Sequence, residues 1–483
     1  MDEPGSNGGA AALENKVMSD PLSYARVDSQ KHNSLPVLWR VLGLLGAFAA
    51  SSAAINLSRM VDRDRLVPVR LDELWYAGAL AVVLAGVGLF FVQASRTSPR
   101  DRAGWFLLFF ALRAVLSVLL ALIFQYDDER GFHYAGIDEV SDLLTSMGGR
   151  GYYQLVETLY KFLYPTMLLP KMLNALTGAI LPFLIYDVAL AVHRNRSTAK
   201  RAFLLAGLMP PLIIFSAVNL KEALTAFLLV LEVWFFARSV GKLAWQMSGA
   251  ICTIGLLFWL RGTPWAAVGV VGLIALLAIR KRGDGRPRAL SVRVGGVIAA
   301  GALLAVSWGA FSGDLFGMIE SRLTQEAYFI ERFSGSEAKV TQFLEVGNPL
   351  SPKNVGILFL RGLFSPSPAR FVFDRGIDTI LEMTVMLTWY GLLPFAVIGW
   401  MRGADRRLAH ICGVVAMTVL ALASTAVMLG GDPYRHRIAM VGLLYVLAAD
   451  GLDWSLRPRP KWVVPVWWVG ALSFTGIWLT QRV

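Results

Sequence analysis

Residues 106–125 read FLLFFALRAVLSVLLALIFQ, and the stretch that follows, 126–134, reads YDDERGFHY. As a helix, the first stretch is long and apolar enough to cross the roughly 30 Å hydrocarbon core of a bilayer. The second places three adjacent carboxylates, Asp127, Asp128 and Glu129, where that helix ends. Charges at a membrane boundary are costly and often functional. Together the two stretches predict a membrane protein with an acidic site at one face.

Apolar runs of this kind recur along the chain. Of its 483 residues, 55% are hydrophobic and 17% charged, with a mean hydropathy of +0.54, whereas about 25% of residues are charged in an ordinary soluble protein. We therefore expect an all-α polytopic membrane protein with about 13 transmembrane helices. The expected spans lie near residues 37–57, 76–95, 106–125, 163–192, 202–218, 222–238, 246–260, 264–279, 294–311, 379–400, 409–429, 436–450 and 463–480.

The distribution of Lys and Arg predicts the orientation of these spans. Basic residues are dense in loops that would share one side, 96–105, 193–201, 238–242, 280–293, 401–410 and 453–461. The positive-inside rule makes that side cytoplasmic, together with the N-terminus. Loops 126–161 and 311–378 are then outside, where we expect interfacial helices. Topology also accounts for the net charge of +12, so no nucleic-acid partner is predicted.

The acidic triplet supports two kinds of chemistry. The carboxylates of Asp127 and Asp128 could bind a divalent cation such as Mg²⁺ or Mn²⁺, or one of the three acids could act as a general base. If the segment is helical, Glu129 and His133 share a face. The alternative is a solvated loop with no catalytic or metal-binding role, in which the acids pair with Arg130.

Basic residues at other outer turns predict an anion site. The arginine guanidinium is a planar fork that binds two phosphate oxygens at once. Taken singly, each residue could be an interfacial anchor, but together they favour a seat for a lipid phosphate or pyrophosphate. The residues expected to bind the lipid phosphate or the sugar are these cations, their neighbours Glu222 and His436, and two further residues, His133 and Glu382. The cations are Lys221, Arg261, Arg435 and Arg437.

Some charges fall inside the predicted spans. Glu382 would lie about one turn below the outer boundary, and an intramembrane acid is a functional candidate. We interpret Arg113, Asp187 and Glu232 as members of interhelical pairs. Cys252 and Cys412 both lie in apolar runs, which excludes a disulfide framework.

Three stretches resemble the GT-C class of multi-spanning glycosyltransferases. They are the acidic motif 127–134, the helix KMLNALTGA from Lys171 to Ala179 running on to Tyr186, and the turn from Ser216 to Glu222. Lys171 replaces the usual Arg of the helix motif. Residues 364–368 and 434–437 resemble stretches of membrane proteins that are encoded with bacterial exopolysaccharide and O-antigen genes.

The resemblance implies a domain division and a reaction. Residues 1–36 would be a disordered cytoplasmic tail, 37–105 two added N-terminal helices, 106–450 the GT-C-like core and 451–483 a C-terminal helix. Enzymes of this class transfer a sugar from a polyprenyl-linked donor at the outer face, with inversion expected here. Asp127 or Asp128 would be the base. Lys221, Arg261, Arg435 and Arg437 would neutralise the leaving phosphate, and a metal ion is optional.

The sequence thus predicts a glycosyltransferase of the inner (cytoplasmic) membrane that acts in cell-surface polysaccharide or glycolipid assembly. Its partners would be a polyprenyl-(pyro)phosphate-linked sugar, a glycan or lipid-linked acceptor, and membrane lipids. A polysaccharide polymerase or ligase is an alternative within the enzymes. A lipid or glycan transporter is the alternative from another class, although it would place its charges near the middle of the bilayer.

Overall fold

The computed structural model describes residues 68–94, 101–138, 150–238, 243–279, 377–428 and 433–455, together with Leu363 and Val469. All regular secondary structure in this part of the chain is α-helix. The predicted tail and the spans expected at 37–57 and 294–311 lie outside the described residues. So do the last predicted span, apart from Val469, and nearly all of the outer loop 311–378.

Long helices cover the spans expected in the described part of the chain. They are α3 (Leu71–Ala94), α4 (Arg102–Ile123), α8 (Leu168–His193), α11 (Glu222–Arg238), α12 (Leu243–Arg261), α13 (Thr263–Ile279), α18 (Ile377–Arg402), α19 (Arg406–Met428) and α20 (Pro433–Ser455). Of the long span expected at 163–192, residues 168–192 belong to one helix, α8, which contains Pro182. The prediction that these segments are helical is confirmed. Among them, α3, α4, α8, α18 and α19 are long and apolar enough to cross a membrane.

One expected span is broken. The span expected at 202–218 falls on two helices, α9 (Arg196–Leu208) and α10 (Pro210–Ser216), which are bent by 45° at Met209. Proline lacks a backbone N–H and clashes with the preceding turn, which explains the break at this position. Within the described residues, five helices are long and apolar enough to cross a membrane, or six if α9 and α10 form one span. The chain is therefore a multi-pass membrane protein, and the total of about 13 spans stays a prediction.

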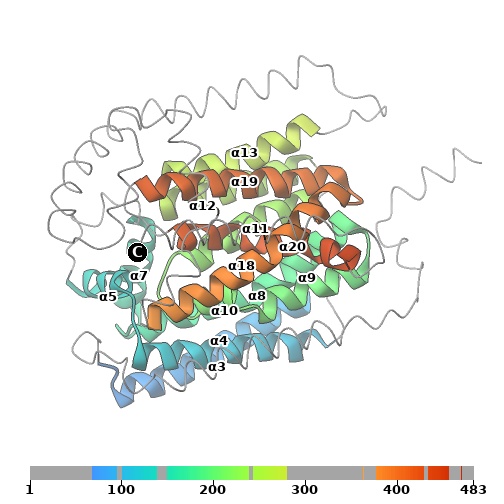
Figure 1. Cartoon of the computed structure of the whole chain (residues 1–483). Helices are drawn as coiled ribbons and strands as arrows, with labels where there is room; N and C mark the ends of the chain where they lie inside the picture. Colours follow the sequence, from blue (N-terminus) through green and yellow to red (C-terminus); the bar gives the residue numbers. More distant parts are fainter. Residues whose placement is uncertain are drawn as a thin grey trace, which may run out of the picture.

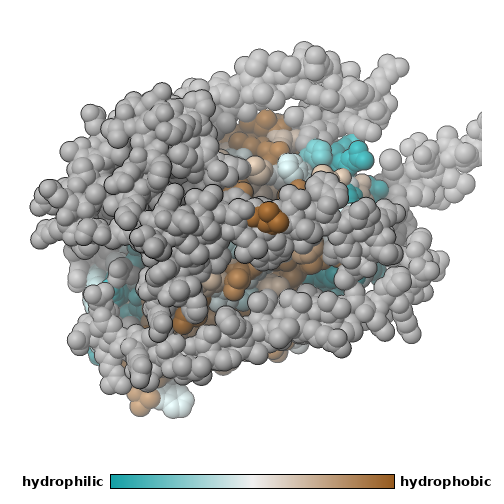
Figure 2. Space-filling model, in the orientation of Figure 1, coloured by the Kyte–Doolittle hydropathy of each residue, from teal (hydrophilic) through white to brown (hydrophobic). Residues whose placement is uncertain are grey.

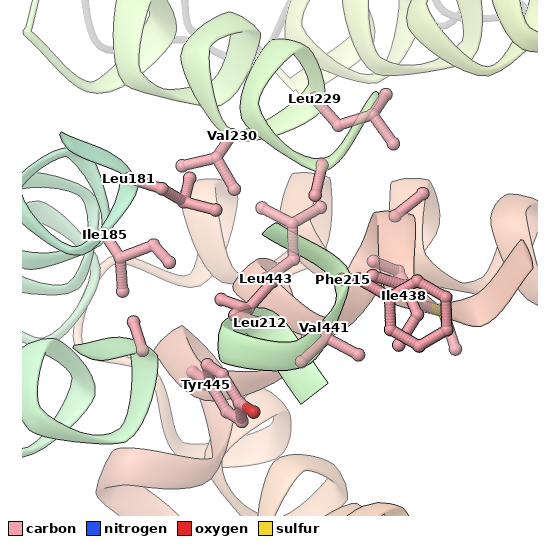
Figure 3. Close-up of a cluster of buried hydrophobic side chains, with 14 of the residues drawn as sticks. Leu181, Ile185, Leu212, Phe215, Leu229, Val230, Ile438, Val441, Leu443 and Tyr445 are labelled. Atoms are coloured by element: carbon pink, nitrogen blue, oxygen red, sulfur yellow. The ribbon is translucent and has the colours of Figure 1, made fainter. Parts of the chain in front are cut away.

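The long helices run side by side, and two shorter helices lie across one end of them (Figure 1). These are α5 (Asp127–Asp138) and α7 (Arg150–Phe162), seen at the left. Helix α20 packs against α18, α19, α11, α9 and α8. Buried aliphatic residues such as Leu181, Val230 and Leu443 point toward one another between α8, α11 and α20 (Figure 3). This packing fixes the ends of α8, α11 and α20, which carry the candidate residues.

The outward faces of several helices are apolar. Val82 and Phe90 on α3, Val115 on α4 and Phe258 on α12 are all exposed. Figure 2 shows apolar residues mostly in the middle of the described surface and hydrophilic ones toward its left and right margins. An apolar middle with polar ends is the surface expected of helices that face lipid.

Helices α18 and α20 approach each other through glycine. A Cβ atom on Gly399 would collide with the carbonyl oxygen of Leu447, and one on Gly451 with the carbonyl oxygen of Phe395. Small residues allow helix backbones to pack closely where apolar burial alone gives little driving force. These contacts fix the C-terminal end of α20, whereas Arg435 lies near the start of the same helix.

Candidate functional site

The acidic motif is helical, and a buried ion pair anchors it. Helix α5 begins at Asp127. Glu129 Oε2 lies 2.7 Å from Lys171 Nζ on α8, and neither side chain is exposed. Burial raises the pKa of Glu129, and the neighbouring Lys171 ammonium opposes that effect. Glu129, predicted as one of three possible bases, is therefore enclosed and ties α5 to α8.

A second polar residue on α8 holds the turn before α11. Asn174 Nδ2 lies 2.8 Å from the carbonyl oxygens of both Val218 and Leu220. Tyr152 on α7 donates its hydroxyl to Asn219 Oδ1 at 2.8 Å. Residues three apart share a helix face, so the helix motif presents Lys171 and Asn174 together. One face of α8 thus orients both α5 and the turn that ends at Lys221.

Three cations from different parts of the chain meet beyond this turn. Arg261, at the end of α12, donates from Nη2 to Glu222 Oε1 at 3.0 Å. Arg435, near the start of α20, places its Nη2 3.5 Å from the same oxygen. Lys221 precedes Glu222 in sequence. We call Lys221, Arg261 and Arg435 the cation cluster, and Glu222 is the buried carboxylate at its centre.

Aromatic rings support each of these cations. The guanidinium of Arg261 lies 4.5 Å from the ring centroid of Trp265. Arg435 lies 5.8 Å from the ring of Tyr126, and Lys221 lies 5.8 Å from the ring of Phe132. Cation–π contact stabilises a positive charge that has lost part of its hydration.

His436 lies at the edge of the cation cluster, and burial affects the charge of Lys221 within it. The His436 ring stacks on Trp265 at 6.2 Å between centroids, so this histidine borders the cluster. Burial, reinforced by Arg261, lowers the pKa of Lys221 to about 8. Lys221 is therefore a cation whose charge depends on pH near the physiological range.

Asp128 joins the acidic motif to the cation cluster. Its Oδ2 accepts from Arg435 Nη2 at 2.8 Å, and its side chain is 51% exposed. The structure thus brings together Asp128, Lys221, Glu222, Arg261 and Arg435, and their roles in binding and catalysis stay predictions. The side chain of Asp127 lies outside the described residues, and its role stays a prediction.

The remaining candidates have other surroundings. His133 Nδ1 lies 2.9 Å from the Tyr160 hydroxyl, between α5 and α7. Arg437 donates to the carbonyl oxygen of Leu363 at 3.0 Å and lies 4.9 Å from the ring of Trp389. Glu382 is buried on α18. Arg437 thus faces α18, and the cation cluster is built without it.

The described residues do not favour a divalent cation. Among them, no group of three or more His, Cys, Asp or Glu side chains could hold a metal ion. Glu129, Glu222 and Asp128 each face Lys or Arg at salt-bridge distance. A site with more cations than carboxylates suits an anion. The metal role predicted for Asp127 and Asp128 stays a prediction.

Several residues that shape the site had no role in the sequence-based prediction. Lys171 and Asn174 appeared only as parts of a motif, although a lysine inside an apolar helix is itself a signal. Tyr126, Tyr152 and Trp265 gave no comparable signal, because aromatic residues are common at the ends of membrane helices.

No protein-family model and no curated protein matches the chain. Similar solved structures include ArnT from Cupriavidus metallidurans bound to undecaprenyl phosphate, with a TM-score of 0.38, 14% identity, and coverage of 85% of this chain and 64% of that one. Another is the archaeal oligosaccharyltransferase AglB from Archaeoglobus fulgidus in complex with an inhibitory peptide and a dolichol-phosphate. Its TM-score is 0.29, with 13% identity and coverage of 86% and 56%.

The chain thus spans less than two thirds of the length of either protein. These structural neighbours are of the GT-C class that the sequence motifs resemble. At TM-scores this low, the resemblance by itself assigns no function to the chain.

Proposed function

We propose that the chain is a membrane glycosyltransferase that uses a polyprenyl-(pyro)phosphate-linked sugar in cell-surface polysaccharide or glycolipid assembly. The observation that carries the proposal is the 2.8 Å contact between Asp128 and Arg435. It places a half-exposed carboxylate against a cluster of three cations. A base and an anion seat side by side are what transfer from a sugar phosphate requires.

In the proposed reaction, Asp128 accepts the proton of an acceptor hydroxyl as its oxygen attacks the anomeric carbon. The new carbon–oxygen bond forms while the bond to the phosphate oxygen breaks, and the phosphate takes the electron pair. Attack opposite to the leaving group inverts the configuration. Lys221, Arg261 and Arg435 stabilise the charge that develops on the phosphate.

The cation cluster suits a phosphate bound to a lipid. Three cations face the carboxylates of Glu222 and Asp128, which leaves one net positive charge when Lys221 is protonated. That charge matches a phosphodiester, and a pyrophosphate would draw further on the same donors. The cluster lies at the ends of α11, α12 and α20. In the proposed function these helices cross the bilayer, and a polyprenyl chain presents its head group at that level.

The outer face of the cytoplasmic membrane is part of this proposal. At the opposite end of the helices, Arg194 pairs with Asp405 and Arg201 with Asp453. The loops at that end carry the dense Lys and Arg that mark the cytoplasmic side. The cation cluster would then face outward. Its position at helix ends also favours an enzyme over a transporter with a site in mid-bilayer.

Transfer of a labelled sugar tests the proposal. The full chain in proteoliposomes is given polyprenyl phosphate or pyrophosphate carrying a radiolabelled sugar, and cleavage of the sugar–phosphate bond is followed. Asp128→Asn should lower transfer by roughly 10²- to 10⁴-fold, with unchanged expression and helix content. Full activity of this variant would refute the role of Asp128 as the base. Movement of the intact donor across the bilayer without cleavage would instead indicate a transporter.

Asp453→Asn is a matched control for that experiment. Asp453 also pairs with an arginine, Arg201, at 2.6 Å, but at the other end of α20. Residues 435 and 453 of one helix are separated by about 27 Å along its axis. The control variant should keep transfer near the wild-type rate.

A further inference from the structure

Resting on the function proposed above, we propose that Arg435 is an exchangeable partner. Without donor it holds Asp128. When the donor phosphate binds, Arg435 turns to the phosphate and frees Asp128 to accept the acceptor's proton. The base would then be available only while a donor occupies the cation cluster.

The contrast between two ion pairs supports this exchange. The pair of Glu222 and Arg261 is enclosed, with side chains 1% and 2% exposed. In the pair of Asp128 and Arg435 the side chains are 51% and 15% exposed. Exposed ion pairs contribute little to stability, whereas separating a buried pair leaves an uncompensated charge. An incoming anion would therefore displace Asp128 from Arg435 before it displaced Glu222 from Arg261.

Arg435 keeps other support when it leaves Asp128. Its guanidinium lies 3.5 Å from Glu222 Oε1 and 5.8 Å from the ring of Tyr126. These contacts hold the side chain beside the cluster while its exposed partner changes. The proposed exchange breaks the contact with Asp128 and keeps the contacts with Glu222 and Tyr126, so it needs no movement of α20.

Charge is conserved through the proposed reaction. The acceptor's proton moves to Asp128 Oδ2, which removes the negative charge of that carboxylate. At the same time the sugar–phosphate bond breaks, and the leaving phosphate gains one negative charge. The negative charge thus passes from one partner of Arg435 to the other, and the cluster faces the same net charge before and after transfer.

The exchange makes an unusual prediction for the proposed base, namely that its removal should improve binding of the lipid phosphate. The probe is polyprenyl phosphate, the leaving group of the reaction, titrated against the full chain in detergent. Asp128→Asn should bind it more tightly, on the order of two- to fivefold, because an exposed ion pair of this strength no longer competes for Arg435. Asp453→Asn serves again as the control and should bind like the wild type.

A double-mutant cycle separates exchange from simple charge removal. Any anion gains affinity when a nearby carboxylate is neutralised, whether or not Arg435 is involved. If Arg435 is the shared partner, the gain from Asp128→Asn should disappear in an Arg435→Gln background. An equal gain in both backgrounds would overturn the exchange, as would the absence of any gain in the wild-type background.

A second variant at position 435 keeps the test informative if Arg435→Gln does not fold. Arg435→Lys keeps the charge but loses the planar fork, so Asp128→Asn should gain less there than in the wild type. Thermal unfolding of every variant shows which backgrounds are folded. A gain as large in the lysine background as in the wild type would count against the exchange.

Failure of the exchange and failure of the proposed function give different results. If Asp128→Asn loses transfer but binds polyprenyl phosphate no more tightly, only the exchange is wrong. If the wild type neither binds polyprenyl phosphate nor cleaves the donor, the proposed function is wrong, and the exchange falls with it.

Discussion

Lys171 on α8 and Glu129 on α5 form an ion pair of 2.7 Å in which both side chains are fully buried. Lys171→Met would leave the Glu129 carboxylate enclosed without its partner. Breaking a buried pair in this way costs about 3–5 kcal/mol. We expect a large fall in the unfolding temperature in detergent, and a loss of transfer because α5 carries Asp128.

The double variant Lys171→Met/Glu129→Gln is the control for that prediction. It removes both charges and should recover much of the stability lost by Lys171→Met alone. Lys171→Arg keeps the positive charge and should be milder still. An unfolding temperature of Lys171→Met equal to that of the wild type would show that the ion pair does not anchor α5.

The lowered pKa of Lys221 predicts that binding of the lipid phosphate depends on pH. Its pKa is lowered to about 8, chiefly by burial. Only the protonated ammonium attracts an anion, so the contribution of Lys221 is present below that pKa and is lost as the pH rises through it. The affinity for polyprenyl phosphate, titrated between pH 6.5 and 9.5, should therefore fall above about pH 8.

Lys221→Arg isolates this effect, because arginine stays protonated throughout that range. Ionisation of the lipid phosphate itself is common to both proteins and cancels in the comparison. The affinity of the variant should stay level where that of the wild type falls. Parallel pH profiles would assign the dependence to another group.

Arg435 and Arg437 should differ sharply when each is replaced by alanine. Arg435 belongs to the cation cluster, whereas Arg437 donates to Leu363 and lies over Trp389. Arg435→Ala should weaken binding of polyprenyl phosphate by at least tenfold, which corresponds to about 1.4 kcal/mol. Arg437→Ala should act mainly on thermal stability. A larger loss of affinity in Arg437→Ala would restore the role that the sequence suggested for this residue.

Replacing a glycine at the contact between α18 and α20 should strongly destabilise the protein. Gly451→Ala would place a methyl group against the carbonyl oxygen of Phe395, so the two helices must separate. We expect a lower unfolding temperature and reduced transfer. Gly255→Ala on α12 is the matched control, since nothing lies within 4 Å of a Cβ atom there. Alanine is the better helix former, so that variant should be neutral or slightly stabilised.

The positions of the helices follow from the sequence more directly than the directions of their side chains. Hydropathy predicted where α3, α4, α8 and α18 run, and charges at helix ends predicted which residues could meet. Positions two apart on a helix do not face the same way. Arg435 and Arg437 therefore diverge, one toward Asp128 and the other toward α18. The same helical geometry separates the exposed Asp128 from the buried Glu129.

Other features depend on contacts that the sequence does not encode locally. Asn174 reaches the carbonyl oxygens of Val218 and Leu220, which are distant in the chain. The bend at Met209 could be anticipated from the two prolines that follow it, because proline cannot continue a helical hydrogen-bond ladder. The contact of α11, α12 and α20 at Glu222 could not be anticipated from the sequence, because it requires the packing of the whole bundle.

That meeting of helices has a consequence for the timing of biosynthesis. Glu222 and Arg261 lie in the middle of the chain, but Arg435 is made much later. At ordinary translation rates the interval between Arg261 and Arg435 is roughly ten to thirty seconds. Until α20 has been inserted, a nascent chain would have Glu222 and Arg261 but no Arg435. An unfinished or truncated copy should therefore leave the cell's pool of lipid-linked sugars untouched.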